Sequence, residues 1–284
     1  MERTWLDVPF DDKDAAKAAG ARWDPAARRW YAPRPGAPGL GRWAALPDLM
    51  PGEDRGYGEG LFVDLIPRTS WFQNVRAAVD PADWDRLRRM VYRRAGHRCE
   101  ACGASGSQLE AHERFTYDTQ PGVQRLVRLI CLCTACHRVT HFGRTMLQGD
   151  AAGQAALDHL QAVTGMNDAQ TERHIRDAFD RWQRRSEISW RVDLSLITSA
   201  GIRLSQAPPK PEHPRPAVAG NAQDEAGILV ITTVTAVVIP EPTAAPGPGP
   251  ATRALAATYQ RYAGELATIE ALRSQHPGAR GHYR

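Results

Sequence analysis

Two cysteine pairs with C-x-x-C spacing constrain the fold of this chain more than any other feature of its sequence. The first pair is Cys99 and Cys102 in "CEAC", and the second is Cys133 and Cys136 in "CTAC", about thirty residues later. Two such pairs are typical of zinc knuckles that close on one tetrahedral ion. We therefore predict a structural Zn²⁺ ion that holds a hairpin against a helix. A redox pair, or Cys131 in place of Cys133 as a ligand, is the alternative.

Three histidines near these pairs are surplus to a zinc site made of four cysteines. In "LCTACHRVTH", His137 and His141 stand four residues apart, so both would project from one side of a helix that begins near Cys136. His112 in "LEAHERF" lies on a predicted strand between the cysteine pairs. Three imidazoles can bind one ion and leave positions for water and phosphate, so the sequence predicts a second metal site. The alternative is that one histidine packs against the zinc knuckle and the others bind DNA phosphates.

The order of these motifs resembles one known family. C-x-x-C, then L-E-x-H, then L-C-x-x-C-H-x-x-x-H, from Cys99 to His141, is similar to the zinc-stapled branch of the HNH endonucleases. The resemblance implies a treble-clef or ββα-metal finger inside a domain that spans about residues 58–204. It also implies that the three histidines hold a catalytic divalent ion, such as Mg²⁺ or Mn²⁺, for hydrolysis of phosphodiester bonds.

Two positions depart from the family's pattern. Glu113 occupies the place of the general-base histidine, and Arg128 falls at about the place of an asparagine that orients the site. A carboxylate near a cation can accept a proton from water, so Glu113 is a candidate base. Neighbouring residues on a strand point to opposite faces, however, and Glu113 would face the site only where the backbone bends. The alternative is a solvated carboxylate, or one that supports a histidine.

The N-terminal segment carries a second resemblance. "LDVPFDDKDAAKAAGARWDPAARRWYAP" predicts a short strand, a helix over about 11–19, a turn and an aromatic strand. It is similar to a small domain of unknown function that is attached to plasmid primases, anti-restriction proteins and other DNA-handling enzymes. Its tryptophans, Trp23 and Trp30, stand beside arginines and could stack on single-stranded bases. The alternative is that the two tryptophans form the core of the small domain.

The predicted fold class is α+β, with five segments. Residues 1–45 are a small αβ accessory domain, 46–57 are a linker, and 58–204 are the zinc-stapled domain with flanking helices. Proline-rich sequence predicts a flexible linker over 205–250 that contains a short apolar strand, and 251–284 is a helical basic tail. The best-marked helix runs from Asp80 to Gly96, with Asp80 as N-cap and Pro81 at its first position.

Charge and hydropathy point to a nucleic-acid partner and away from a membrane. The net charge is only +4, but "RLRRMVYRRAGHR" is densely cationic, which suits phosphate contacts, although a solvated helix face is the alternative. We expect DNA to be bound with weak sequence preference and strong salt dependence. The arginines expected to contact it are Arg22, Arg29, Arg128, Arg138 and Arg144. The chain shows no secretory start and no apolar run long enough to span a membrane, so a cytoplasmic location is expected.

Together these patterns predict a metal-dependent endonuclease of HNH type. Its catalytic residues would be His112, His137, His141 and Glu113, and the structural zinc would hold the finger in shape. The alternative is a catalytically inactive zinc-finger protein that binds DNA or a protein partner. Three histidines beyond the zinc ligands favour the enzyme, because a pure binding module has no chemical need for them.

Overall fold

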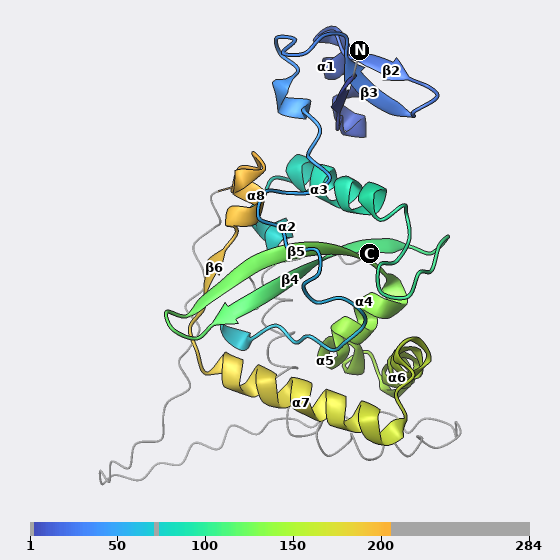
Figure 1. The fold of residues 1–284 in the computed structure, drawn as a ribbon, viewed down its shortest axis with the longest axis vertical. Helices are drawn as coiled ribbons and strands as arrows, with labels where there is room; N and C mark the ends of the chain where they lie inside the picture. Colours follow the sequence, from blue (N-terminus) through green and yellow to red (C-terminus); the bar gives the residue numbers. More distant parts are fainter. Residues whose placement is uncertain (1–2, 71–73, 206–284) are drawn as a thin grey trace, which may run out of the picture.

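The fold contains two small sheets, one in the N-terminal unit and one built on a long hairpin later in the chain (Figure 1). It is seen in a computed structural model that describes residues 3–70 and 74–205, and its class is mixed α+β, as predicted. The segments predicted as an apolar strand inside a proline-rich linker, and as a helical basic tail, lie outside the described residues. No helix in the described ranges combines the length and the apolar character that crossing a bilayer requires.

The N-terminal unit is a three-stranded antiparallel sheet with one short helix. Its elements are β1 (Thr4–Leu6), η1 (Phe10–Asp12), α1 (Lys13–Ala18), β2 (Arg22–Asp24), β3 (Arg29–Ala32) and η2 (Gly41–Trp43), with sheet order β1-β3-β2. The predicted helix is confirmed. It ends before Gly20, whose φ of +95° is favourable for glycine and strained for other residues.

Trp43 is the tryptophan that fills the core of this unit. Its side chain packs with Leu6 and Ala16, and its indole nitrogen donates to Asp12 Oδ2 at 2.7 Å. Trp30 packs against this core only in part, and Trp23 is 48% exposed. The alternative in which both Trp23 and Trp30 form the core is therefore wrong for Trp23.

The second sheet is built on a long hairpin. β4 (Leu109–Asp118) and β5 (Val123–Cys133) pair in antiparallel fashion, with a bulge between Arg114 and Phe115, and β6 (Arg191–Asp193) pairs in parallel with β5. The remaining elements are η3 (Arg68–Ser70), α2 (Val75–Ala78), α3 (Pro81–Arg94), α4 (Thr134–Thr140), α5 (Phe142–Met146), α6 (Asp150–Thr164), α7 (Asp168–Ser186) and α8 (Ser195–Ser199). The predicted N-cap of α3 at Asp80 and the proline at its first position are confirmed.

The hairpin separates two hydrophobic cores, because alternate residues of a strand point to opposite faces. On one face, Ile130 and Leu132 pack against α4 to α7. On the other face, Leu129 and Cys131 pack against α2, α3 and α8. Figure 1 shows α3 on one side of the hairpin and α4 on the other. The residues that follow Cys133 therefore lie against the first face.

Residues 46–57, which the composition predicts to be a linker, pack against the domain that contains the long hairpin. Leu46 and Met50 are buried in the core that contains α2 and α3. Glu53 Oε2 accepts a hydrogen bond from Arg94 Nη1 at 2.6 Å, and both side chains are almost fully buried. Proline and glycine content indicated irregular backbone here, but it did not exclude close packing.

Candidate metal centres

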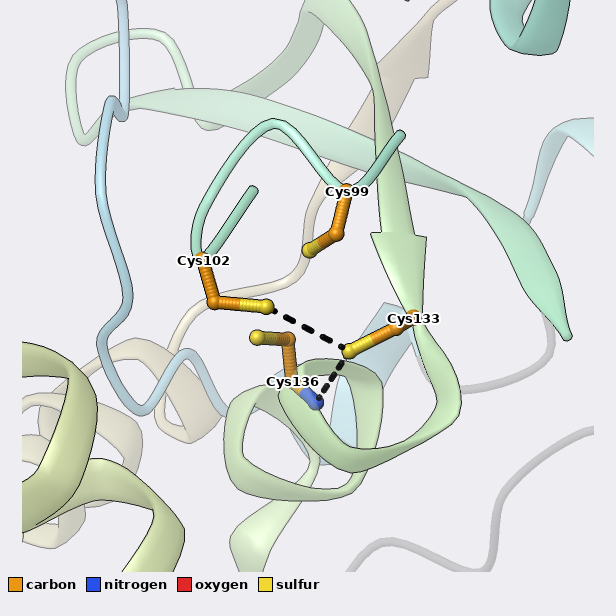
Figure 2. A group of neighbouring side chains, drawn as sticks. All are labelled: Cys99, Cys102, Cys133 and Cys136. Atoms are coloured by element: carbon orange, nitrogen blue, oxygen red, sulfur yellow. Dashed lines mark hydrogen bonds between the residues drawn. The ribbon is translucent and has the colours of Figure 1, made fainter. Parts of the chain in front are cut away.

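Four cysteines lie together where the end of the hairpin meets α4 (Figure 2). Their sulfur atoms are all within 4.8 Å of one another, and Cys102 Sγ lies 3.7 Å from Cys133 Sγ. Zinc–sulfur bonds of about 2.3 Å in a tetrahedron place neighbouring sulfurs about 3.8 Å apart, so the cluster fits an ion such as zinc. The backbone N–H of Cys136 donates to Cys133 Sγ at 3.5 Å.

Three thiols of this cluster differ in how readily they ionise. A hydrogen bond from Cys136 lowers the pKa of Cys99 to about 4, whereas the hydrogen bond with Cys99 raises the pKa of Cys136, and burial raises that of Cys102. Cys131 differs. It is fully buried in the core on the other face of the hairpin, and burial raises its pKa to about 12. The structure thus places Cys133 in the cluster and leaves Cys131 outside it.

A second cluster is formed by the three predicted histidines. His112 comes from β4, His137 lies within α4, and His141 follows the last residue of that helix. The ring centroid of His112 lies 5.3 Å from that of His137 and 4.8 Å from that of His141, and the centroids of His137 and His141 are 4.6 Å apart. The backbone N–H of His141 donates to His137 O at 3.0 Å, so the helical spacing of the two rings persists past the end of α4.

The ring nitrogens of this cluster are positioned to bind an ion. One nitrogen from each ring lies within 4.8 Å of the others. His112 Nδ1 is buried, with no hydrogen-bond partner in residues 3–70 and 74–205. His137 Nδ1 lies 3.1 Å from Glu110 Oε2, a carboxylate partner of the kind that orients metal-binding histidines. The donor set therefore fits a divalent cation with three imidazole ligands and an open position.

Burial favours the neutral form of His112 and His137, which is the form that binds metal. Desolvation, with the charges of Arg144 and Arg114, lowers the pKa of His137 to about 3. The pKa of His112 also lies well below its ordinary value, first because of burial and then because of His141, Arg114 and His137. Neither ring competes for a proton near neutral pH.

Arg114 is a residue of this site that the sequence reading missed. Its side chain is fully buried, and Nε, Nη1 and Nη2 find no hydrogen-bond partner among the described residues. The guanidinium carbon lies 4.1 Å from the ring centroid of Phe62. Arg114 follows His112 by two residues on β4, and this spacing was the available signal, because residues i and i+2 of a strand share a face.

Glu113 is not brought into the histidine cluster. It is paired in register with Leu129, whose side chain belongs to the core on the α3 side of the hairpin. Its Oε1 accepts a hydrogen bond from the backbone N–H of Val75 at 3.1 Å, at the start of α2. The bulge in β4 falls after Arg114, too late to turn Glu113 toward His112. Burial raises the pKa of its carboxyl group.

The five arginines predicted to contact DNA occupy different environments. Arg128 is 4% exposed, and its guanidinium donates to Glu100 Oε1 at 3.1 Å and to Tyr57 O at 3.0 Å. These hydrogen bonds within the protein occupy donors that were expected to contact DNA. Arg138 is exposed on α4. The charge of Arg144 acts on His137 and Glu110, so Arg144 lies beside the cluster. In the N-terminal unit Arg22 is exposed, and Arg29 Nη2 lies 3.5 Å from Asp7 Oδ1.

Comparison with known proteins identifies the N-terminal unit. Residues 3–43 match a family described as "Domain of unknown function (DUF5710)", which confirms the predicted resemblance of this segment. Two proteins of Escherichia coli, both named DNA primase TraC, are similar to the chain: one is 49% identical over 52 residues and the other 55% over 42.

The matched segments are a small part of this chain and a smaller part of the two primases. They cover 18% and 14% of this chain, but only 5% and 3% of the two primases. No solved structure matches the chain. Because the family match ends at residue 43, it does not bear on the cysteine and histidine motifs.

Proposed function

We propose that the protein is a metal-dependent endonuclease of HNH type that hydrolyses DNA phosphodiester bonds. The observation that carries this proposal is the convergence of three histidines from a strand and the end of a helix, with His112 Nδ1 left without a partner in the described part of the chain. A hairpin followed by a short helix, held by four cysteines, supports the treble-clef, ββα-metal arrangement. The similarity of the N-terminal unit to segments of DNA primases supports DNA as the substrate.

Each residue of the site has a role in this proposal. His112, His137 and His141 would bind a divalent ion such as Mg²⁺ or Mn²⁺, which supplies Lewis acidity to the phosphate and acidifies a bound water. Glu110 orients His137 through Nδ1. Arg114, which is fully buried, would act through its positive charge, which lowers the pKa of His112 and His137 and would stabilise a negative phosphate bound at the ion.

Glu113 has a supporting role in this scheme. Its carboxylate holds the first N–H group of α2 on the other face of the hairpin, where it cannot reach a water bound beside His112. Ionisation of a metal-bound water does not depend on a base at this position. The proposal therefore does not need the general-base histidine whose place Glu113 takes.

The experiment that tests the proposal is plasmid nicking with Mg²⁺ or Mn²⁺, run beside EDTA. The comparison is with a variant carrying His112→Ala and His137→Ala, in which every cysteine is retained. Nicking by the wild type that disappears in the double variant is the expected result. Zinc content and melting temperature of the variant serve as controls for its fold. Equal nicking by both proteins would assign the activity to something other than the histidines.

The second candidate function is a zinc-finger protein that binds DNA or a partner without cleaving it. One observation favours it: Glu113 faces away from the histidines and Arg128 is engaged by Glu100, so neither position that departs from the family pattern contributes to the site. Metal content separates the two functions. One tightly held zinc plus a weaker divalent ion favours the enzyme, whereas zinc alone, with no nicking, favours the binding protein.

A further inference from the structure

An open groove lies between the N-terminal unit and α3. Two contacts hold its walls together: Arg93 Nη1 donates to Asp7 Oδ1 at 3.3 Å, and Arg86 Nη2 donates to Ala44 O at 2.6 Å. The groove has a volume of about 930 Å³ and is lined by residues of both units. It is thus a feature of the joined structure and not of either unit alone.

The walls of the groove are strongly basic. Asp7 is the one carboxylate among the described residues that line it, and it is occupied by Arg29 at 3.5 Å and by Arg93. The cations of the lining are Lys13, Lys17, Arg28, Arg29, Arg89 and Arg93. Such an excess of positive charge in a concave surface attracts a polyanion.

Aromatic rings are exposed in the same groove. Phe10 is 70% exposed and Trp23 is 48% exposed, and these are two of the four large hydrophobic side chains that are exposed in the described ranges. Trp30, paired with Trp23 across β2 and β3, also lines the groove, with its ring centroid 5.4 Å from that of Trp23. Exposed apolar side chains that gather in one place with polar residues around them mark a ligand-binding groove or an interaction site.

We propose that this groove binds single-stranded nucleic acid. Bases would stack on Trp23 and Phe10, while phosphates contact the lining cations that Asp7 does not hold, which are Lys13, Lys17, Arg28 and Arg89. A single strand fits better than a duplex, because the faces of paired bases are covered by their neighbours and cannot stack on a protein ring. An apolar peptide fits poorly, because six cations surround the rings.

The groove is separate from the histidine site. It is walled by α3, which packs on the face of the hairpin opposite to α4. Binding in the groove therefore does not rest on the proposed nuclease activity. If the chain does cleave DNA, the groove would hold an unpaired segment of the substrate at a distance from the metal.

The test is fluorescence anisotropy with the full chain and no added divalent ion. The probes are labelled single strands of about 20 nucleotides, thymidine DNA in one arm and uridine RNA in another, beside a duplex of the same length. Wild-type protein is expected to bind a single strand at least about tenfold more tightly than the duplex, with affinity that falls steeply as salt rises.

Variants of the rings decide whether stacking carries the binding. Replacement of both rings (Phe10→Leu with Trp23→Leu) keeps apolar bulk and removes both ring faces, and it should weaken single-strand binding by about fivefold or more for each ring. Trp23→Phe keeps a ring and should retain most of the affinity. Leu204→Ala, at a side chain that is also 48% exposed, is the matched control and should bind like the wild type.

Two results would overturn the proposal. One is unchanged single-strand binding by the variant without rings, and the other is an equal loss of single-strand and duplex binding in that variant. The histidine double variant of the nicking assay should bind the single strand normally. Loss of nicking with retained binding in that variant, or a failure of the wild type to nick at all, leaves the groove proposal standing.

Discussion

Cys136 and His137 are neighbours on α4, yet they belong to clusters with different chemistry. The cysteine cluster has four sulfur atoms, enough to complete a tetrahedron around an ion, and Cys99, Cys133 and Cys136 belong to a hydrophobic core. The histidine cluster has three ligands and charged neighbours, Glu110 and Arg114 among them. A closed set of ligands in a core stabilises a fold, whereas an open set beside unpaired donors is suited to bind a substrate. One short helix thus connects a structural site to a candidate reactive site.

Loss of the cysteine cluster should have the largest effect. Cys136→Ser, or removal of zinc by a strong chelator, should unfold the domain that contains the β4–β5 hairpin. Structural zinc supplies about 10–16 kcal/mol in zinc-finger peptides, as much as the whole stability of a typical domain, which is about 5–15 kcal/mol. Zinc content and circular dichroism measure the loss. Cys131→Ala is the control, and it should keep one zinc per chain because Cys131 lies on the other face.

Arg114→Met should reduce cleavage and raise stability at the same time. A buried guanidinium without a partner destabilises the fold, and methionine of similar length relieves that cost. Loss of the positive charge near the reacting phosphate should slow cleavage by about a hundredfold or more. Melting temperature and nicking rate are the two measurements.

Arg128→Met is the matched control, since Arg128 is paired in register with Arg114. Arg128 is engaged by Glu100, so its loss should destabilise the fold by about 3 kcal/mol. If Arg114→Met lowers the melting temperature as Arg128→Met does, Arg114 has a structural partner and no special role in phosphate binding.

Glu110→Gln should weaken the histidine site and leave the cysteine site intact. The carboxylate oxygen that lies 3.1 Å from His137 Nδ1 orients the ring and raises its basicity, and loss of such partners costs about 10- to 100-fold in metal affinity. Titration of zinc-loaded protein with Mn²⁺ by calorimetry gives the affinity. Unchanged Mn²⁺ affinity would show that Glu110 does not orient a metal ligand.

Glu113→Gln should have the smallest effect on cleavage. The carboxylate points to the other core, and glutamine can still accept the hydrogen bond from Val75. We expect a nicking rate close to that of the wild type. A nicking rate lower by about a hundredfold to ten-thousandfold, the usual contribution of a general base, would show that Glu113 acts as the base.

Local spacing predicted much of the candidate site. Cysteine pairs and the four-residue interval between His137 and His141 depend on backbone geometry over a few residues, and the structure brings each set together. The strand that carries His112 and the helix that follows Cys133 also lie where they were predicted. The alternation of side chains along a strand correctly indicated that Glu113 points away from His112.

Contacts between distant residues could not be predicted. The arginines of α3 were expected as a surface for phosphate, but Arg93 contacts Asp7 and Asp48, and Arg94 is buried against Glu53. These carboxylates lie more than forty residues earlier in the chain, and no local pattern connects them to the helix. The same limit applies to Arg114, whose burial depends on packing of the hairpin.

The most direct test of two metal sites with different roles is anomalous diffraction from crystals that contain zinc and are soaked in Mn²⁺. Data collected at the absorption edges of zinc and manganese locate each metal independently. We expect a zinc peak among Cys99, Cys102, Cys133 and Cys136, and a manganese peak within coordination distance of His112, His137 and His141. A filled zinc site with no manganese among the histidines would contradict the proposed reactive centre.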